Sequence, residues 1–299
     1  MDRFHLINVF VAVVDTKGFA GAARKLSMSP PAVTRAVNEL EAHLGLRLLT
    51  RNTRTVRVTD AGERYVQDCR RILADLLEAD ESVSGMHAAV QGRLTVTAPV
   101  LFGGRYVTPV VTAYLQRYPN VTAQCLFLDR LVNLTEEGAD VAIRIGELPD
   151  SSLQAIRVGQ VRRVICASPD YLARCGLPLQ PDDLHGHTIV SANSVTPNPE
   201  WKLMHKGETR TVRLQARMVT TTNDAAMSAA LSGFGLTRLL SYQVADHLQT
   251  GRLTTVLPDC EPAPLPIHVV HREGRQVPQR VRAFLDLAIE RLRENPLLQ

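Results

Sequence analysis

Residues 19–45 read FAGAARKLSMSPPAVTRAVNELEAHLG and contain two short helical patterns separated by a turn. The first pattern repeats apolar residues at helical spacing until Ser27-Met28-Ser29 interrupts it. Ser29 is a favoured N-cap residue, and prolines at 30 and 31 are tolerated in a first helical turn, whose N–H groups have no intrahelical acceptor. Gly45 ends the second pattern. The stretch therefore predicts a helix-turn-helix.

The second helix of this pair carries polar side chains opposite its apolar stripe. A helix-turn-helix can place the leading turns of its second helix in the major groove of DNA, where side chains meet base edges. Such helix pairs also occur as plain structural elements, so spacing alone leaves both interpretations open. The residues of this helix that we expect to contact DNA are Ser29, Pro30, Pro31, Thr34, Arg35 and Asn38.

Residues 42–59 contain four arginines and no acidic residue. The segments 46–49 and 55–58 alternate in the strand period, which predicts a two-stranded wing with residues 51–54 at its tip. Arginines at such a tip can lie along phosphates, and a solvated basic loop is the alternative. Residues 1–64 hold ten basic and six acidic residues, a difference of +4 that equals the formal net charge of the whole chain. The wing residues expected to contact DNA are Arg47, Arg51, Asn52 and Arg54.

About sixty N-terminal residues carry a specific run of motifs. These motifs are Ala22-Ala23-Arg24-Lys25-Leu26, residues 29–35, Leu40-Glu41, Leu44-Gly45, residues 48–51 and residues 58–62. In them the chain resembles the LysR-type transcriptional regulators, with Gly18 in place of a usual serine and Leu49 in place of a usual phenylalanine. The resemblance implies a homodimer or homotetramer that binds an inverted repeat in double-stranded promoter DNA. It also implies control by a small-molecule effector.

Residues 60–90 predict one long helix that follows the DNA-binding domain of residues 1–59. At ~1.5 Å per residue, a helix of about 28 residues is roughly 42 Å long, too long for one small domain to cover. Apolar residues recur along this helix in a heptad row, through which two copies of the helix could pair. Packing of the helix along the chain's own second domain is the alternative. The family resemblance implies a dimerising linker. The heptad row, interrupted at Asp80, consists of Val66, Cys69, Leu73, Leu76 and Val83, and an adjacent seven-residue row consists of Tyr65, Ile72, Ala79 and Met86.

From residue 91 the pattern changes to strands that alternate with helices, including a short helix at 131–137, which predicts mostly parallel sheets. Crossings near 159–162 and 263–266 divide residues 91–299 into lobe I (91–161 and 266–299) and lobe II (162–265). We therefore expect an α+β multidomain protein: an N-terminal winged helix-turn-helix, a long linker helix and a C-terminal α/β two-lobed, periplasmic-binding-protein-like effector domain. The family resemblance extends through this half in residues 102–105, 137–146 and 167–172.

A cleft between two such lobes is the default ligand site. Residues 99–104 follow a strand and lead to the amino end of a helix, whose free N–H groups suit an anion such as a small carboxylate. Asp129 and Asp224 have the alternative roles of helix caps or salt-bridge partners, and Arg144 has the alternative of pairing with Asp129. The candidate effector-binding residues are Val100, Leu101, Gly103, Gly104, Arg105, Asp129, Arg144, Asn223, Asp224 and His271.

The composition of the 299 residues, 45% hydrophobic and 21% charged, is that of a packed globular protein. No run approaches the ~18 apolar residues that span a bilayer, and five cysteines without a Cys-x-x-Cys pair suit a reducing cytoplasm. Hydrolase, P-loop and zinc-protease motifs are absent, and His185-Gly186-His187 lacks a third metal ligand in a regular element. We expect no enzyme activity, no cofactor, no metal and no membrane partner. The rival function is a small-molecule sensor whose helical head binds a protein rather than DNA, which the acid-free arginine segment disfavours.

Overall fold

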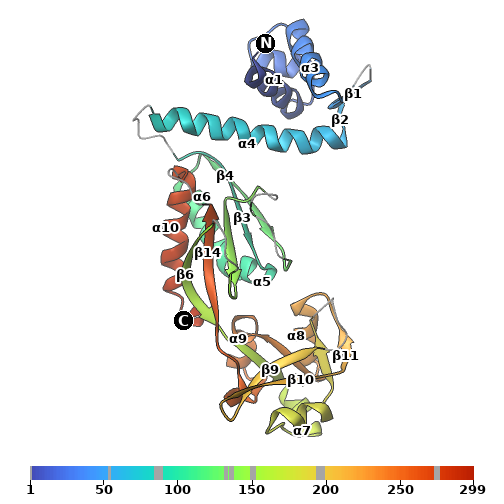
Figure 1. The fold of residues 1–299 in the computed structure, drawn as a ribbon, viewed down its shortest axis with the longest axis vertical. Coiled ribbons are helices and arrows are strands. Elements are labelled where there is room, and N and C mark those ends of the chain that lie inside the picture. Colours follow the sequence, from blue (N-terminus) through green and yellow to red (C-terminus); the bar gives the residue numbers. More distant parts are fainter. Residues whose placement is uncertain are drawn as a thin grey trace. The chain divides into compact units, whose positions relative to one another are not determined.

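The chain divides into two compact units, Met1–Ala89 and Val90–Gln299 (Figure 1). The computed structural model describes residues 2–52, 55–83, 90–130, 134, 138–148, 153–192, 199–272 and 277–299.

The first unit opens with three helices, α1 (Arg3–Asp15), α2 (Phe19–Lys25) and α3 (Pro30–Leu44). Phe10, Val37 and Leu40 are fully buried among them, so one apolar core holds the three helices together. The predicted helix-turn-helix is confirmed in α2 and α3, and Gly45 adopts the left-handed conformation (φ +69°) that ends α3. Among the described residues no single helix is long and apolar enough to cross a membrane, although α1 and α2 pass that test together across a bend of 119°.

A two-stranded antiparallel wing follows, with β1 (Leu49–Asn52) pairing β2 (Thr55–Val58). The prediction of a first strand at 46–49 was wrong by three residues. The carboxylate of Glu41 on α3 accepts the N–H groups of Leu48 and Leu49 at 2.8 and 2.9 Å, so the segment before Leu49 serves to close the end of α3. Thr53 and Arg54, part of the predicted wing tip, lie outside the described residues.

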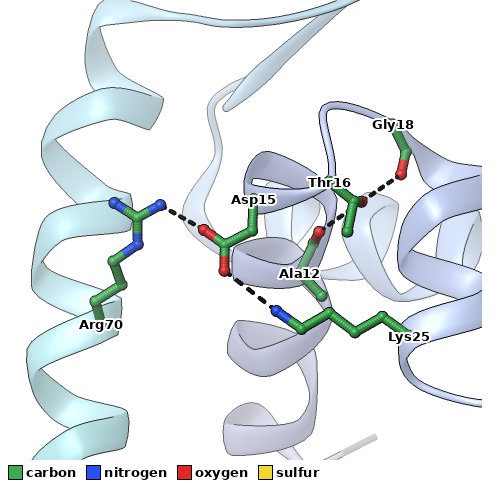
Figure 2. Close-up of polar contacts among 6 residues, drawn as sticks. All are labelled: Ala12, Asp15, Thr16, Gly18, Lys25 and Arg70. Carbon is green, nitrogen blue, oxygen red and sulfur yellow. Dashed lines mark hydrogen bonds and ion pairs between the residues drawn. The ribbon is translucent and has the colours of Figure 1, made fainter. Parts of the chain in front are cut away.

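The linker helix α4 (Asp60–Val83) starts after Thr59, whose hydroxyl accepts the Gly62 N–H at 3.0 Å and whose own N–H donates to the Leu48 carbonyl, just before β1, at 2.9 Å. Asp15 at the end of α1 accepts from Lys25 at 3.4 Å and from Arg70 of α4 at 2.5 Å (Figure 2). The first half of α4 is thereby fixed to the helix-turn-helix. The predicted helical residues 84–89 lie outside the described part of the chain.

The apolar row of α4 is divided between two environments, which corrects the single heptad face expected from sequence. Val66 and Cys69 are buried in the core of the first unit, and Leu73 packs against that core. Ile72 and Leu76 are instead 39% and 37% exposed. Of these five side chains, only Ile72 and Leu76 are open to a partner helix.

Lobe I of the second unit is a five-stranded sheet in the order β4-β3-β5-β14-β6 (Figure 1). The first three strands are parallel, whereas β14 is antiparallel to both β5 and β6. Because β6 therefore runs in the same direction as β5, four of the five strands share one direction and the expected mostly parallel sheet is confirmed, with β14 as the antiparallel strand. The strands are β3 (Gly92–Ala98), β4 (Val121–Phe127), β5 (Val141–Ile145), β6 (Leu153–Val161) and β14 (Leu265–Arg272).

Helices pack on this sheet through one apolar core that includes Phe102, Tyr114 and Phe284. A continuous helical segment follows β3, made of α5 (Val100–Phe102), a π-helical turn (Gly103–Val107) and α6 (Thr108–Arg117), and α10 (Gln279–Arg293) packs beside α6. Of the short helix expected at 131–137, only Leu134 is described, in a turn.

Lobe II is a second five-stranded mixed sheet, in the order β11-β8-β12-β7-β13. Strands β11 and β12 are both parallel to β8. Strand β7 is antiparallel to its two neighbours, β12 and β13. The strands are β7 (Arg163–Ala167), β8 (Ile189–Ser191), β11 (Ala216–Val219), β12 (Leu236–Leu240) and β13 (Thr254–Val256). Its further elements are α7 (Pro169–Cys175), α8 (Asn223–Leu231), α9 (Ser241–Gln249) and the hairpin β9 (Glu200–His205) with β10 (Glu208–Arg213).

Helix α9 joins the cores of the two lobes. Tyr242 is buried against the rings of Phe102 and Tyr106 in lobe I, with ring centroids 5.3 and 5.8 Å away. Val244, two residues later, is buried in the core of lobe II. The start of α9 therefore stands where the two lobes meet.

Candidate nucleic-acid interface and ligand cleft

The outer side of α3 presents the polar residues that the sequence assigns to DNA. Val33 and Val37 point into the core, while Arg35 and Asn38 are exposed and Thr34 is half-buried. Ser29, Pro30 and Pro31 are exposed at the start of the helix. The structure thus brings the six predicted α3 residues together at the start and on the outer side of one helix.

The start of α3 leaves the hydroxyl of Ser29 outside the helix hydrogen bonding. Ser29 is extended (φ −74°, ψ 145°) and its side chain makes no capping hydrogen bond. Pro30 and Pro31 have no N–H, and the N–H groups of Ala32 and Val33 both donate to the Ser29 carbonyl, at 2.9 and 3.1 Å. A hydroxyl that caps nothing can donate to, or accept from, an external partner.

The wing is described in part. Arg47 is exposed, and the backbones of Arg51 and Asn52 lie in β1, paired with Val56 and Thr55. The structure says nothing of the Arg51 and Asn52 side chains, and Arg54 lies outside the described residues. The contact of these three side chains with phosphates stays a prediction.

The second unit contains a cleft of about 340 Å³ where the two lobes meet. Lobe I contributes Pro99, Asp129 and Ile145 to its lining. The lobe II strands contribute Arg163 and residues 238–240, and the start of α9 contributes Tyr242 and Gln243. This volume lies within the usual range of ~300–1,000 Å³ for small-molecule pockets. Its polar lining consists of Asp129, Arg163, Asn223, Arg238 and Gln243.

Two arginines face each other on the lobe II side of the cleft. Leu240 of β12 pairs with Arg163 of β7, so Arg238 lies diagonally opposite Arg163 on the same face of the sheet. Burial, together with the smaller effect of the nearby positive charge of Arg163, lowers the pKa of Arg238 to about 10. Burial also lowers the pKa of Arg163. Among the described residues no carboxylate forms an ion pair with either arginine, so the cleft wall carries uncompensated positive charge.

Arg238 is also held over an aromatic ring. Its guanidinium carbon lies 5.2 Å from the centroid of Trp201, a buried residue of the β9–β10 hairpin. A cation over the face of tryptophan is attracted to its ring electrons and loses rotamer freedom. The arginine is therefore positioned before any ligand arrives.

The lobe I helix starts at Val100, three residues earlier than the anion site expected at Gly103 and Gly104. The Val100 N–H donates to the Asp129 carboxylate at 3.0 Å, so an anion of the chain itself occupies this helix start. Gly103 lies inside the helical segment, where its N–H donates to the Pro99 carbonyl at 2.7 Å and an added Cβ would meet the Phe127 ring. The expectation of free N–H groups at the two glycines is thereby corrected, and Asp129 acts as a helix cap.

Arg105 is engaged within the protein rather than toward the cleft. Its guanidinium pairs with Asp246 of α9 at 2.5 Å and contacts the Tyr242 carbonyl at 3.4 Å. Arg144 is half-buried on β5, and its neighbour Ile145, which points to the other face of the sheet, is the one that lines the cleft. Burial lowers the pKa of Arg144.

Of the ten residues predicted for the effector, Asp129 and Asn223 line the cleft. Val100 is exposed, Leu101 packs against the lobe I core, and His271 is buried on β14. Asp224 is exposed in the first turn of α8, one residue after Asn223. The eight residues that do not line the cleft are Val100, Leu101, Gly103, Gly104, Arg105, Arg144, Asp224 and His271.

Sequence reasoning missed Arg163 and Arg238. A charged residue inside the apolar run Leu236-Thr237-Arg238-Leu239-Leu240 was the available signal, because arginine is rarely placed in a central strand without a partner or a ligand. The position of Arg163 as first residue of β7 had no comparable signal. Only the register of β7 against β12 places the two side chains together.

Metal chemistry finds no support in the described part of the chain, where no group of three or more histidine, cysteine, aspartate or glutamate side chains could hold an ion. The His185-Gly186-His187 pair lies at the end of a 3-10 turn, and His187 Nδ1 is 3.2 Å from the Tyr171 hydroxyl. Burial lowers the pKa of His187, which favours a neutral ring in this contact.

Known protein families match both units. Residues 4–63 match the model described as bacterial regulatory helix-turn-helix protein, lysR family, and residues 87–293 match the LysR substrate binding domain. An uncharacterised HTH-type transcriptional regulator of Haemophilus influenzae is 32% identical, over 94% of this chain and 98% of that protein.

Solved full-length structures are similar as well. The Vibrio cholerae virulence activator AphB, titled a member of the LTTR protein family, aligns with a TM-score of 0.62 and 28% identity over 97% of this chain and 99% of that one. CrgA, a LysR-type transcriptional regulator from Neisseria meningitidis, aligns with a TM-score of 0.63 and 29% identity over the same 97% and 99%.

Proposed function

The chain belongs to the LysR family of transcriptional regulators, and from this we propose that α3 reads promoter DNA under the control of an anionic small molecule bound in the lobe cleft. Members of this family are regulators rather than enzymes, bind DNA and small-molecule effectors, and form oligomers. The matched helix-turn-helix family decides against a head that binds protein instead of DNA. The proposal places the protein with the chromosome, in the cytoplasm.

One observation carries the DNA-reading role: α3 exposes Ser29 and Arg35 while its opposite face is fully buried. An arginine can form two hydrogen bonds with a guanine edge, whereas a serine hydroxyl bonds bases or phosphates. Thr34 and Asn38 extend this surface along the helix, and Arg47, Arg51, Asn52 and Arg54 are assigned to the adjoining phosphates. We expect the target to be an inverted repeat near a promoter, matching the two-fold symmetry of a dimer.

The DNA-reading role is tested by fluorescence anisotropy with DNA from upstream of the protein's own gene and with a shuffled sequence. Arg35→Ala should reduce the difference in binding free energy between the two DNA sequences by about 1–3 kcal/mol, which is the contribution of a good bidentate base contact. Arg282→Ala, which removes an exposed arginine of α10, is the matched control and should keep the wild-type ratio. An unchanged ratio in Arg35→Ala would show that α3 is not the reader.

We assign oligomer formation to the exposed part of α4. Ile72 and Leu76 are exposed large apolar side chains among those of this helix that the structure describes. Leu76→Asp would bury unpaired charges at a paired helix and should reduce the sedimenting mass and operator binding together. Leu177→Asp, at an exposed leucine of the second unit, should keep both. A native mass for Leu76→Asp would place the interface elsewhere.

An anionic effector is favoured by the cleft wall in lobe II. Arg163 and Arg238 are desolvated, lie on one face of the sheet and have no carboxylate partner among the described residues. A carboxylate-bearing ligand would supply the missing charge through charge-assisted hydrogen bonds. Asn223, at the start of α8, adds a neutral polar contact from the same lobe.

A further inference from the structure

The two cleft arginines form a like-charge pair, which sets the charge that a ligand must bring. They are diagonal neighbours on adjacent antiparallel strands, where side chains of this length reach one another. The mutual repulsion is visible in the lowered pKa of Arg238, to which Arg163 contributes. A ligand with one negative charge neutralises one guanidinium and leaves the other unpaired in a partly desolvated wall.

The lobe I side of the same cleft disfavours a ligand that carries a second negative group at its far end. Asp129 lines the cavity from that side, and its carboxylate already accepts the Val100 N–H at 3.0 Å. A ligand with a carboxylate at each end would place one of them against Asp129, which is unfavourable between like charges. The negative charges of the ligand therefore belong at one end.

We propose that the cleft binds a small molecule with a dianionic head, seated on Arg163 and Arg238, and a neutral portion directed at Asp129 and the apolar lining. The head is a tetrahedral oxyanion group or two closely spaced carboxylates, because either offers the oxygens of two negative charges within reach of two neighbouring guanidinium groups. The apolar contacts for the rest of the ligand come from Ile145, Leu240 and Leu265. This inference rests on the proposed anionic effector and narrows it.

The protein contains its own reporter for this site. Trp201 is the single tryptophan of the chain, and the Arg238 guanidinium lies 5.2 Å from its ring. A ligand that draws Arg238 toward the cleft changes the electrostatic environment of the indole. Tryptophan fluorescence of the full chain therefore reports occupancy directly.

The test titrates the full-length protein with matched anions at constant ionic strength. Malonate is compared with acetate, and sulfate with perchlorate, so that each dianion has a monoanion with the same carboxylate group or the same tetrahedral shape. At least one dianion should give a saturable change in Trp201 fluorescence at a concentration about tenfold or more below its monoanion, since each tenfold is ~1.4 kcal/mol of binding free energy. Malonate preference indicates a dicarboxylate effector, and sulfate preference indicates a phosphoryl or sulfo group.

Variants assign the selectivity to the arginine pair. Arg163→Gln and Arg238→Gln should each bring the dianion midpoint to that of the monoanion. Arg217→Gln removes another arginine of lobe II, one that lies over Phe234 outside the cleft, and should keep the wild-type preference. Circular dichroism verifies folding, and Arg163→Gln alone carries the test if Arg238→Gln does not fold, because it leaves the contact between Arg238 and Trp201 in place.

The outcomes separate the two levels of the proposal. Equal midpoints for each dianion and its monoanion, or retained selectivity in Arg163→Gln, would overturn the dianionic head and leave an anionic effector standing. Saturation by none of the four anions would overturn the anionic effector as well. Operator binding, measured without added anion, tests the DNA-reading role independently of both.

Discussion

The starts of α3 and α5 differ in what they offer to an external anion, although the sequence favours such a partner near both. At α3, two prolines remove N–H donors and the hydroxyl of Ser29 is left without a capping role. At α5, the Val100 N–H is present but donates to Asp129, a residue 29 positions later in the chain. One start is open to a ligand, and the other already holds an anion.

A helix start can bind an external group only where the rest of the chain leaves it open. In the first unit, the polar groups at the start of α3 are exposed to an external partner. In the second unit, the helix start is closed and the uncompensated charge is found on two strands, at Arg163 and Arg238. The two units therefore use different elements for their expected anionic partners.

We expect the largest effect from a carboxylate placed at the start of α3. Ser29→Asp would make the start of α3 resemble that of α5. Aspartate is a good N-cap and is favoured near a helix amino end, so the melting temperature should hold or rise. Its charge would face phosphates, and binding to operator and random DNA should weaken by about 2–4 kcal/mol. Native DNA affinity in this variant would mean that the start of α3 does not approach DNA.

The two neighbouring glycines of the α5–α6 segment test whether this segment is a helix interior. Gly103→Ala places a methyl group against the Phe127 ring and should cost about 1–3 kcal/mol of unfolding free energy, as overpacking does. Gly104→Ala meets no atom within 4 Å and should stabilise the helix by up to about 1 kcal/mol. Chemical denaturation of both variants measures the contrast. Equal changes in unfolding free energy for the two variants would indicate that Gly103 and Gly104 lie at an open helix start and not inside a helix.

Alanine substitutions at Asp129 and at Ser29 compare the two helix starts. Asp129→Ala takes away the acceptor of the Val100 N–H and should lower the unfolding free energy by about 0.5–2 kcal/mol. Ser29→Ala removes a hydroxyl with no capping bond and should change stability by no more than about 0.5 kcal/mol. A larger loss in Ser29→Ala than in Asp129→Ala would reverse the assignment of open and closed starts.

The smallest expected effect concerns Arg105, which the sequence placed near the effector. Its ion pair with Asp246 is largely exposed, and such pairs contribute about 0.2–1 kcal/mol. A double-mutant cycle of Arg105→Ala and Asp246→Ala should give a coupling energy in this range. The malonate or sulfate response of Trp201 should be unchanged in both single variants, and its loss in Arg105→Ala alone would make Arg105 a ligand contact.

Local sequence signals are sufficient for α2 and α3, but not for the wing or for α4. Residues 19–45 carry their helix start, turn and helix end within a few positions of one another, and α2 and α3 follow them. The wing strand moved to Leu49 because a side chain eight residues earlier, Glu41, holds the segment before it. Such a contact leaves no periodic pattern in the sequence.

The cleft could be predicted as a place but not as a set of side chains. Asp129 and Asn223 follow from strand and helix ends, which topology brings to the cleft. Arg163 and Arg238 are 75 positions apart and meet only through the antiparallel register of β7 and β12. Burial of Val66 and Cys69 likewise depends on the packing of α4 into the apolar core formed by the helices of the first unit. Strand register and packing between distant segments determine the arginine pair and the burial of the α4 residues. The periodicity of the sequence indicates neither of these two features.

A nuclease footprint of the full-length wild-type protein, on the intergenic DNA upstream of its own gene, tests whether α3 reads a promoter sequence. We expect protection of two half-sites that form an inverted repeat, at a protein concentration that leaves shuffled DNA unprotected. Arg35→Ala should lose this protection while Arg282→Ala keeps it. Equal protection of upstream and shuffled DNA by the wild-type protein would contradict the claim that the exposed face of α3 reads a promoter sequence.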